Sequence, residues 1–167
     1  ETGGVGYTTT LDISGDGHAW RTYYFMRNFT VTDASKINNM YFDIDYDDAY
    51  AVWINGHMVN TSNWTADWES HNSLAPNSEY GLGTTHHNSL IDTSSDSQPA
   101  MPTNNLSQTQ ISYLIDGTNN ISVAIKQGAD ASSDTAFELR LYGNVNQTEG
   151  DGSEFLNCSS PWQANKT

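Results

Sequence analysis

The sequence predicts an all-β protein, folded as an antiparallel two-sheet β-sandwich. Short stretches rich in aromatic and β-branched residues alternate between apolar and polar positions with a period of two, which is typical of half-buried strands. Turn signals containing Gly, Asn and Asp separate these stretches, and we find neither a long helical pattern nor an internal repeat. At 167 residues the chain is long enough to bury a single core, so we expect one domain.

The first half of the sequence contains the clearest strand patterns. Residues 7–13 and 21–31 are predicted as strands, and alternation in the second places Tyr23, Phe25 and Phe29 on one face. Residues 40–46 continue the pattern, with Phe42 and Ile44 on the apolar side.

Two further strands, residues 49–55 and 57–60, flank the dipeptide Asn55-Gly56. This dipeptide predicts a type I′ hairpin, because both central residues of that turn need a positive φ.

The second half begins with a long predicted loop at residues 60–105, rich in polar residues and unusual in length for a compact domain. A short helical turn near residues 108–114 and strands at 120–126 and 135–143 follow. We expect one β-sandwich domain over residues 5–143 and a polar linker or tail over 144–167. Residues 1–4 are interpreted as the remnant of a cleaved secretion leader and are excluded from the fold.

The charge balance restricts the classes of partner. Lys and Arg together number 6 against 20 Asp and Glu, which gives a net charge of −14. Binding to a phosphate backbone or an anionic membrane surface needs a basic face, so we expect no nucleic-acid partner and no membrane partner. No apolar run approaches the length of a membrane span.

Asparagine acceptor patterns predict a secreted protein, exposed at a cell or virion surface. The pattern Asn-x-Ser/Thr occurs eight times, and glycans at these positions would have to lie on the surface. Cys158 is the one cysteine, so an intrachain disulfide is impossible and an interchain disulfide is a candidate. The eight predicted glycosylation sites are Asn28, Asn60, Asn63, Asn105, Asn120, Asn146, Asn157 and Asn165.

Four segments of the chain resemble the galactose-binding-like jelly-roll modules of large secreted proteins. The resemblance covers roughly residues 5–143, with one departure at Ala49, where the family commonly has Gly. The segments are Tyr24-Phe25-Met26-Arg27-Asn28-Phe29-Thr30-Val31, Asp47-Asp48 with Val52-Trp53-Ile54-Asn55-Gly56, Gly117-Thr118-Asn119 with Val123, and Ser132-Ser133-Asp134 with Phe137-Glu138-Leu139. The resemblance implies a two-sheet jelly roll that accompanies glycosidases, esterases or adhesins without performing the chemistry, in some cases binding glycans with calcium.

An acidic stretch around residues 43–48 is a candidate calcium site. Calcium takes six to eight oxygen ligands, largely carboxylates and carbonyls, and clustered carboxylates repel unless a cation neutralises them. We take Asp45, Asp47 and Asp48 as candidate ligands, beside Asp43 and with Asp130 and Asp134 as additional candidates. The alternative is an Asp-rich turn whose carboxylates accept hydrogen bonds from backbone amides.

Aromatic residues of the 60–105 loop are candidate sugar-binding residues, because flat rings pack against the apolar faces of pyranoses. Trp64, Trp68 and Tyr80 are taken as ligand-binding candidates, together with His57. Trp53 lies within a predicted strand and is assigned to the core. The histidines lack zinc-site spacing.

The sequence carries no nucleophile elbow, phosphate-binding glycine loop or His-Glu-x-x-His motif, so we expect a protein that is not an enzyme. The favoured hypothesis is a non-catalytic extracellular module that recognises a glycan or another surface protein. A structural spacer or assembly domain without a small ligand is the alternative. A calcium-dependent lectin is a third hypothesis.

Overall fold

The computed structural model describes residues 21–46, 48–64, 73–75, 103–129, 137–145 and 163–166. The predicted strand at residues 7–13 lies outside these ranges. The described elements, in chain order, are β1 (Thr22–Val31), η1 (Ala34–Lys36), β2 (Ile37–Tyr46), β3 (Ala49–Ile54), β4 (His57–Ser62), β5 (Thr103–Asn105), α2 (Gln108–Ile111), β6 (Gly117–Lys126), β7 (Phe137–Val145) and β8 (Gln163–Lys166).

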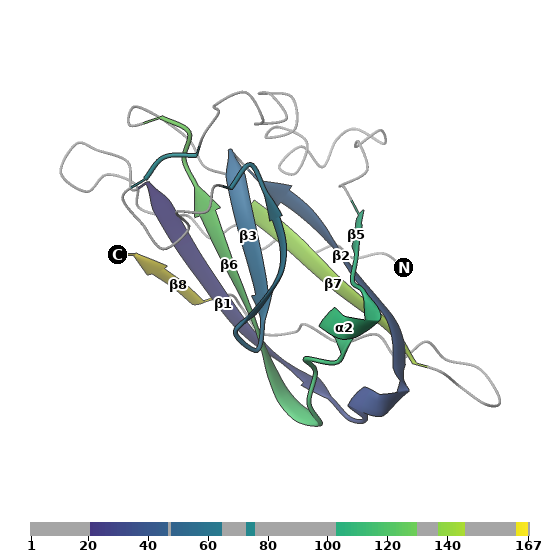
Figure 1. Ribbon diagram of the computed structural model, residues 1–167. Coiled ribbons are helices and arrows are strands. Elements are labelled where there is room, and N and C mark those ends of the chain that lie inside the picture. The colour runs from purple at the N-terminus through teal and green to yellow at the C-terminus, as the bar shows by residue number, and fades with distance from the viewer. Residues whose placement is uncertain are drawn as a thin grey trace, which may run out of the picture.

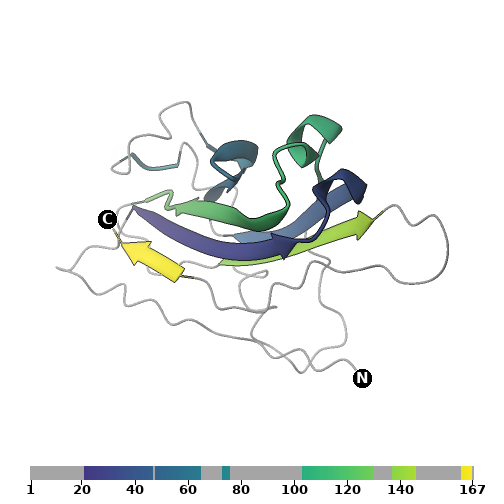
Figure 2. The ribbon, with the colours of Figure 1, turned by 90° about the horizontal axis from the view of Figure 1, so that it is seen from below.

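Two antiparallel sheets form the sandwich, which confirms the predicted fold class. A five-stranded sheet has the order β4-β3-β6-β1-β8, and a three-stranded sheet has the order β5-β2-β7 (Figure 1). Figure 2 shows the two sheets as layers. All of the described strand pairs are antiparallel. Neither of the two helices described is long and apolar enough to span a membrane.

The core lies between the sheets, and the predicted alternation determines which residues enter it. Phe42 and Ile44 of β2 are fully buried, as are Val52 and Ile54 of β3. Trp53 falls between two of these core positions, so it faces away from the core and is half-buried on the outer side of β3. Its assignment to the core was therefore wrong, because alternation along β3 puts its two neighbours inside.

The β3–β4 hairpin turns at Asn55 and Gly56, with φ of 49° and 80°. Both values are positive, which confirms the predicted type I′ geometry. Asn55 also fixes the hairpin to the start of β6. Its side-chain nitrogen donates to Asn119 Oδ1 at 2.7 Å and to the carbonyl of Tyr113 at 2.8 Å, and its Oδ1 accepts from the backbone N–H of Asn120 at 2.8 Å.

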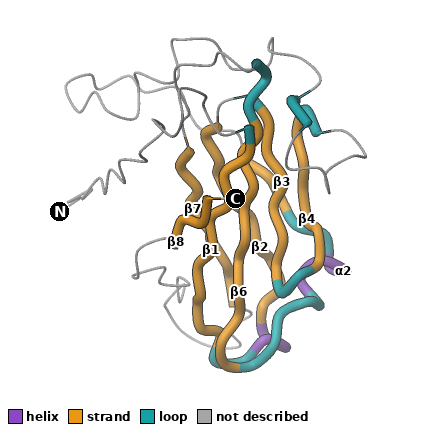
Figure 3. Tube along the Cα trace, turned by 90° about the vertical axis from the view of Figure 1, so that its left-hand side faces the viewer, coloured by secondary structure: helices purple, strands orange, loops and turns teal. Residues whose placement is uncertain are grey.

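Asn119 completes this network from a position that is only 1% exposed. Its side chain donates to the carbonyl oxygens of Ile115 and Gly117, and its Oδ1 accepts from the N–H of Ile115. The hairpin, the α2–β6 connection and β6 are thus joined through two amide side chains. The turn between β3 and β4 lies at the same end of the sandwich as α2 (Figure 3).

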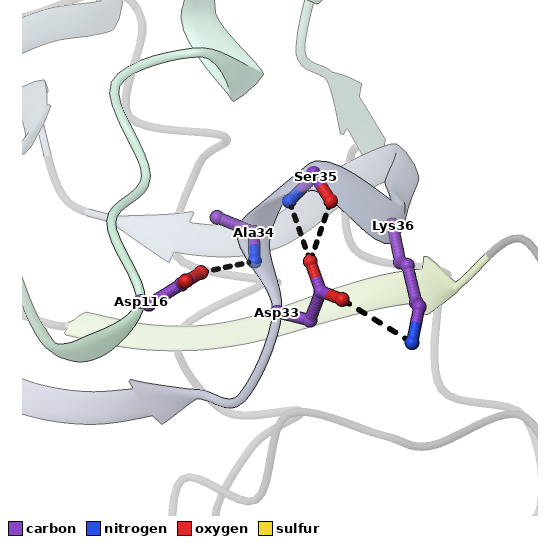
Figure 4. A network of polar contacts seen from close by, with 5 residues as sticks. All are labelled: Asp33, Ala34, Ser35, Lys36 and Asp116. Carbon is purple, nitrogen blue, oxygen red and sulfur yellow. Dashed lines mark hydrogen bonds and ion pairs between the residues drawn. The ribbon is translucent and has the colours of Figure 1, made fainter.

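Acidic residues hold the neighbouring connection between β1 and β2 (Figure 4). Asp33 caps η1, because its Oδ1 accepts from the backbone N–H and the hydroxyl of Ser35, and its other oxygen lies 3.2 Å from Lys36 Nζ. The Ser35 hydrogen bond, followed by the Lys36 ammonium, lowers the pKa of Asp33. Asp116 accepts from the N–H of Ala34 at 2.7 Å, which ties η1 to the turn before β6.

Several boundaries differ from the sequence-based expectations, and β2, β4 and β6 are each longer than predicted. Residues 103–105, expected at the end of a loop, form β5 against β2. β7 continues to Val145, and residues 163–166 of the expected polar tail form β8, paired with β1. A polar edge strand lacks the apolar alternation that marks β1 or β2, so its composition resembles that of a linker.

Replacement of Asn119 by alanine should destabilise the fold by about 3 kcal/mol, because several buried backbone and side-chain groups lose their partner. Urea unfolding measures this loss. Asn39→Ala, at an exposed position of β2, is the matched control and should change the free energy of unfolding by less than about 0.5 kcal/mol. Equal effects of the two variants would contradict the role given to Asn119.

Tyr50 supplies a pH-dependent contact at the edge between the sheets. Burial, and to a lesser extent neighbouring Tyr46, raise the pKa of Tyr50 to about 12. Its hydroxyl donates to Asn60 Oδ1 at 3.1 Å and lies 3.4 Å from Asn104 Oδ1. Because the folded pKa exceeds the ordinary value of 10.0, this contribution is intact below pH 10 and is lost as the pH rises to about 12.

Tyr50→Phe should therefore be less stable than the parent chain at pH 8, and the difference in free energy of unfolding should shrink between pH 10 and 12. Urea unfolding across this range measures the difference. A difference that stays constant with pH would refute the assignment.

Candidate functional site

The sequence-predicted ligand residues that the structure describes lie at opposite ends of β4. His57 is the first residue of this strand, and its imidazole stacks on the ring of Tyr113 with centroids 4.2 Å apart. Trp64 follows the other end of the strand. A six-residue strand separates its two ends by roughly 17 Å, so His57 and Trp64 do not form one site. Trp68 and Tyr80 lie outside the described residues.

Trp64 packs on a buried lysine. Lys126 is 2% exposed, its ammonium donates to Ser73 Oγ at 2.7 Å, and it lies 4.6 Å from the centroid of the Trp64 ring. The indole N–H of Trp64 is buried and has no hydrogen-bond acceptor within the parts of the chain described. The ring therefore stabilises a desolvated cation, which occupies surface that sugar stacking would need.

The acidic stretch is divided between two environments. Asp43 lies on the outer face of β2 and its Oδ1 accepts from the Thr103 hydroxyl at 2.7 Å. Asp48 is 8% exposed and its Oδ2 accepts from the backbone N–H of Gly128 at 2.7 Å. Asp47, Asp130, Asp134 and the side chain of Asp45 are not among the described parts, and no group of three metal-ligand side chains occurs within those parts. The calcium site stays a prediction.

Each carboxylate described in the structure accepts a hydrogen bond from a backbone amide or a neighbouring hydroxyl. Asp33 and Asp116 fix η1, Asp43 bonds Thr103 and Asp48 bonds Gly128. These contacts are of the kind expected for an Asp-rich turn with a structural role. These four aspartates, in a chain of net charge −14, therefore have a structural role.

The predicted glycosylation sites fall into two groups where the structure describes their side chains. Asn28 on β1 and Asn105 on β5 are exposed. Asn60, Asn63 and Asn120 are half-buried, and their amide nitrogens donate to Asn104 Oδ1, the Asp48 carbonyl and Asn28 Oδ1, respectively. A glycan is attached to that same nitrogen, so these contacts favour occupancy at Asn28 and Asn105. Asn146 and Asn157, the side chain of Asn165, and Cys158 are not described.

A further aromatic site lies on the outer face of the three-stranded sheet. Tyr41 of β2 and Tyr142 of β7 are directly opposite in the strand register, and both are half-buried. Their rings stack with centroids 4.8 Å apart and an interplanar angle of 16°. Neighbouring strands are also about 4.8 Å apart. The two rings therefore face each other along the direction that crosses the sheet.

Polar side chains surround this tyrosine pair. Asp43 follows Tyr41 on the same face of β2, opposite Arg140 of β7 and Thr103 of β5. Asn105 of β5 lies opposite Tyr41. Aromatic faces beside hydroxyl, amide, guanidinium and carboxylate groups match the chemistry of a sugar, which has apolar C–H faces and a rim of hydroxyl groups.

The sequence held part of the signal for this site. Alternation places Tyr41 with Asp43, and Tyr142 with Arg140, on the polar faces of their strands. The missing information was the pairing of β2 with β7, which brings together two tyrosines far apart in the chain.

Comparisons with known proteins show the fold. The chain matches no family model and no curated protein. Among solved structures it is similar to α-L-rhamnosidase from Streptomyces avermitilis complexed with L-rhamnose (TM-score 0.52, 15% identity, 90% of this chain and 11% of that chain). It is also similar to α-L-rhamnosidases from Dictyoglumus thermophilum (0.52, 14%, 89% and 14%) and Aspergillus terreus (0.50, 15%, 92% and 15%).

The chain therefore spans about one seventh or less of the length of these enzymes. At this level of identity the likeness is one of fold, and fold alone does not carry an activity. It shows that a β-sandwich of this kind occurs as one part of large carbohydrate-related proteins.

Stacking of Tyr41 on Tyr142 should contribute about 1 kcal/mol beyond the area that the rings bury. A double-mutant cycle with Tyr41→Leu and Tyr142→Leu, followed by urea unfolding, measures this coupling energy. Tyr24→Leu on the other sheet, combined with Tyr41→Leu, is the control and should be additive. A coupling below about 0.3 kcal/mol for the Tyr41–Tyr142 pair would contradict the stacking.

Proposed function

We propose that the protein is a non-catalytic carbohydrate-recognition module, and that the outer face of the three-stranded sheet binds the sugar. The observation that carries the proposal is the stacked pair of Tyr41 and Tyr142, half-buried on a face that is otherwise polar. Support comes from the likeness to a small part of three α-L-rhamnosidases.

Tyr142 is the residue best placed for an external ligand. It belongs to β7, which is an edge strand among those that the structure describes, and one face of its ring is against Tyr41. The opposite face is turned away from β2, and we expect a pyranose to approach the ring from that side. Arg140, two residues away on the same face, is exposed and supplies donors for sugar hydroxyls or a carboxylate.

An accessory role fits the remaining observations better than catalysis. The chain corresponds to 11–15% of the enzymes with a similar fold. The four carboxylates whose side chains the structure describes are each engaged in a hydrogen bond that fixes a turn or joins strands. The jelly-roll resemblance and the eight acceptor patterns favour a secreted surface protein, in which the module recognises a glycan of a surface partner.

The second candidate function is that of a structural spacer with its own glycans. It is favoured by the density of acceptor patterns, because glycans occupy surface that recognition would use. This candidate predicts no affinity for free oligosaccharides.

Binding of an oligosaccharide panel to the chain produced without glycans tests the proposal. The panel includes L-rhamnose-terminated sugars, because the similar structures are α-L-rhamnosidases. Tyr142→Ala should weaken the binding about tenfold, the loss expected when one stacking contact is removed. Tyr24→Ala, a half-buried tyrosine on the outer face of the other sheet, is the control and should change affinity less than about twofold.

The same panel is measured with calcium and with EDTA. Binding that needs calcium and is insensitive to Tyr142→Ala would favour the predicted site at Asp45, Asp47 and Asp48 over the tyrosine face. Absence of binding in both conditions, in a chain that melts cooperatively, would favour the structural spacer.

A further inference from the structure

Asn105, Tyr41 and Tyr142 form one straight row across the three-stranded sheet. Tyr41 is the register partner of Asn105 on one side and of Tyr142 on the other. All three are on the outer face, since their chain neighbours Met40, Phe42, Leu106 and Leu141 are buried in the core. The row is a glycan acceptor followed by two stacked rings.

The two faces of the Tyr41 ring are turned to opposite sides of the sheet, one to β7 and one to β5. Tyr41 uses one ring face to stack on Tyr142, on the β7 side. Its other face is therefore turned to the β5 side, where Asn105 projects from the same surface. Side chains directly opposite on neighbouring strands have Cβ atoms about 5 Å apart, which places the first sugar on Asn105 within reach of that ring.

Asn105 also has the properties of an occupied acceptor. Its side chain is exposed, and it begins the pattern Asn105-Leu106-Ser107. Asn60, Asn63 and Asn120, by contrast, are half-buried and use their amide nitrogens in hydrogen bonds.

We propose that Asn105 carries an N-linked glycan whose first N-acetylglucosamine packs against the face of Tyr41 that is turned away from Tyr142. The apolar C–H face of the pyranose covers the aromatic ring, as in other carbohydrate–aromatic contacts. The glycan thereby extends the row by one more stacked ring and stabilises β5, a strand of three residues, on β2. This inference does not rest on the proposed function, which uses the opposite side of the tyrosine pair.

The test uses the full chain secreted from a eukaryotic culture and trimmed to a single N-acetylglucosamine per site. Glycopeptide mass spectrometry should find Asn105 occupied. Asn105→Gln should raise the equilibrium constant for unfolding about fivefold when Tyr41 is present, within the range for one aromatic contact. In a Tyr41→Val background the same change should have less than a twofold effect, and in Tyr41→Phe, which keeps the ring, the fivefold effect should return.

Asn28→Gln is the matched control. Asn28 is an exposed acceptor in a strand, but its register partner on β6 is Asn120 and not an aromatic residue. Removal of the Asn28 glycan should change the equilibrium constant for unfolding by the same factor whether or not the Tyr41 ring is present. Asn28 and Tyr41 lie on different sheets, so their effects should be additive.

An NMR measurement on the parent chain tests the proposal even if the Tyr41→Val chain fails to fold. Nuclear Overhauser contacts between the sugar C–H protons at Asn105 and the Tyr41 ring are expected in the parent chain. An unoccupied Asn105, an absence of these contacts, or equal effects of Asn105→Gln with and without the ring would overturn the proposal. Since the carbohydrate panel uses a chain without glycans, its result neither supports nor weakens the proposal for the Asn105 glycan.

Discussion

The hydrogen bond between the side chains of Asn55 and Asn119 is the contact on which the rest of this sandwich depends. It joins the β3–β4 hairpin to the first residues of β6, and through Tyr113 and Ile115 it also holds the segment that follows α2. β6 is the central strand of the larger sheet, paired with β3 and β1. Fixing its start therefore sets the register of three strands. Two of the sequence segments that resemble galactose-binding-like modules, Asn55-Gly56 and Gly117-Thr118-Asn119, meet at this point.

The other end of β6 is fixed by a second set of buried polar groups. Lys126 lies on the outer side of the sheet beneath Trp64, and the turn after β6 donates the N–H of Gly128 to Asp48. Ala49, Ala51 and Ala124 also face outward and yet are 0% exposed, so the sheet is covered there on both sides. The tyrosine face of the smaller sheet is different, because its large side chains remain half-buried among polar groups. This contrast is the physical reason for placing recognition on the smaller sheet.

The fold was largely predictable and the site was not, for reasons visible in particular residues. Alternation predicted the inward positions of Phe42 and Ile44, because β2 carries a clear period-two signal, whereas β3 is apolar at nearly every position and carries a weaker one. Trp53 was assigned to the core because it lies within a predicted strand, but its position between Val52 and Ile54 turns it to the outer side. Strands β5 and β8 are polar and short, so they carry no such signal. Tyr41 and Tyr142 come together because β2 and β7 are neighbours in the sheet. That pairing cannot be predicted from the sequences of the two strands. Trp64 was chosen for its chemistry, while its burial against Lys126 depends on a distant strand.

The pairing of β1 with β6 has a consequence for how the chain folds. These strands exchange ten register pairs, from Thr22 with Lys126 to Val31 with Gly117, although most of the domain lies between them in sequence. In the smaller sheet, β2 likewise lacks one of its two neighbours until β7 has been synthesised. Topologies dominated by such distant pairs fold slowly, because loop closure must precede the contacts that compensate for it. During synthesis β1 therefore remains without its β6 partner until late residues emerge, whereas the β3–β4 hairpin needs only its own short turn, so the larger sheet is assembled from its local hairpin toward its most distant pair.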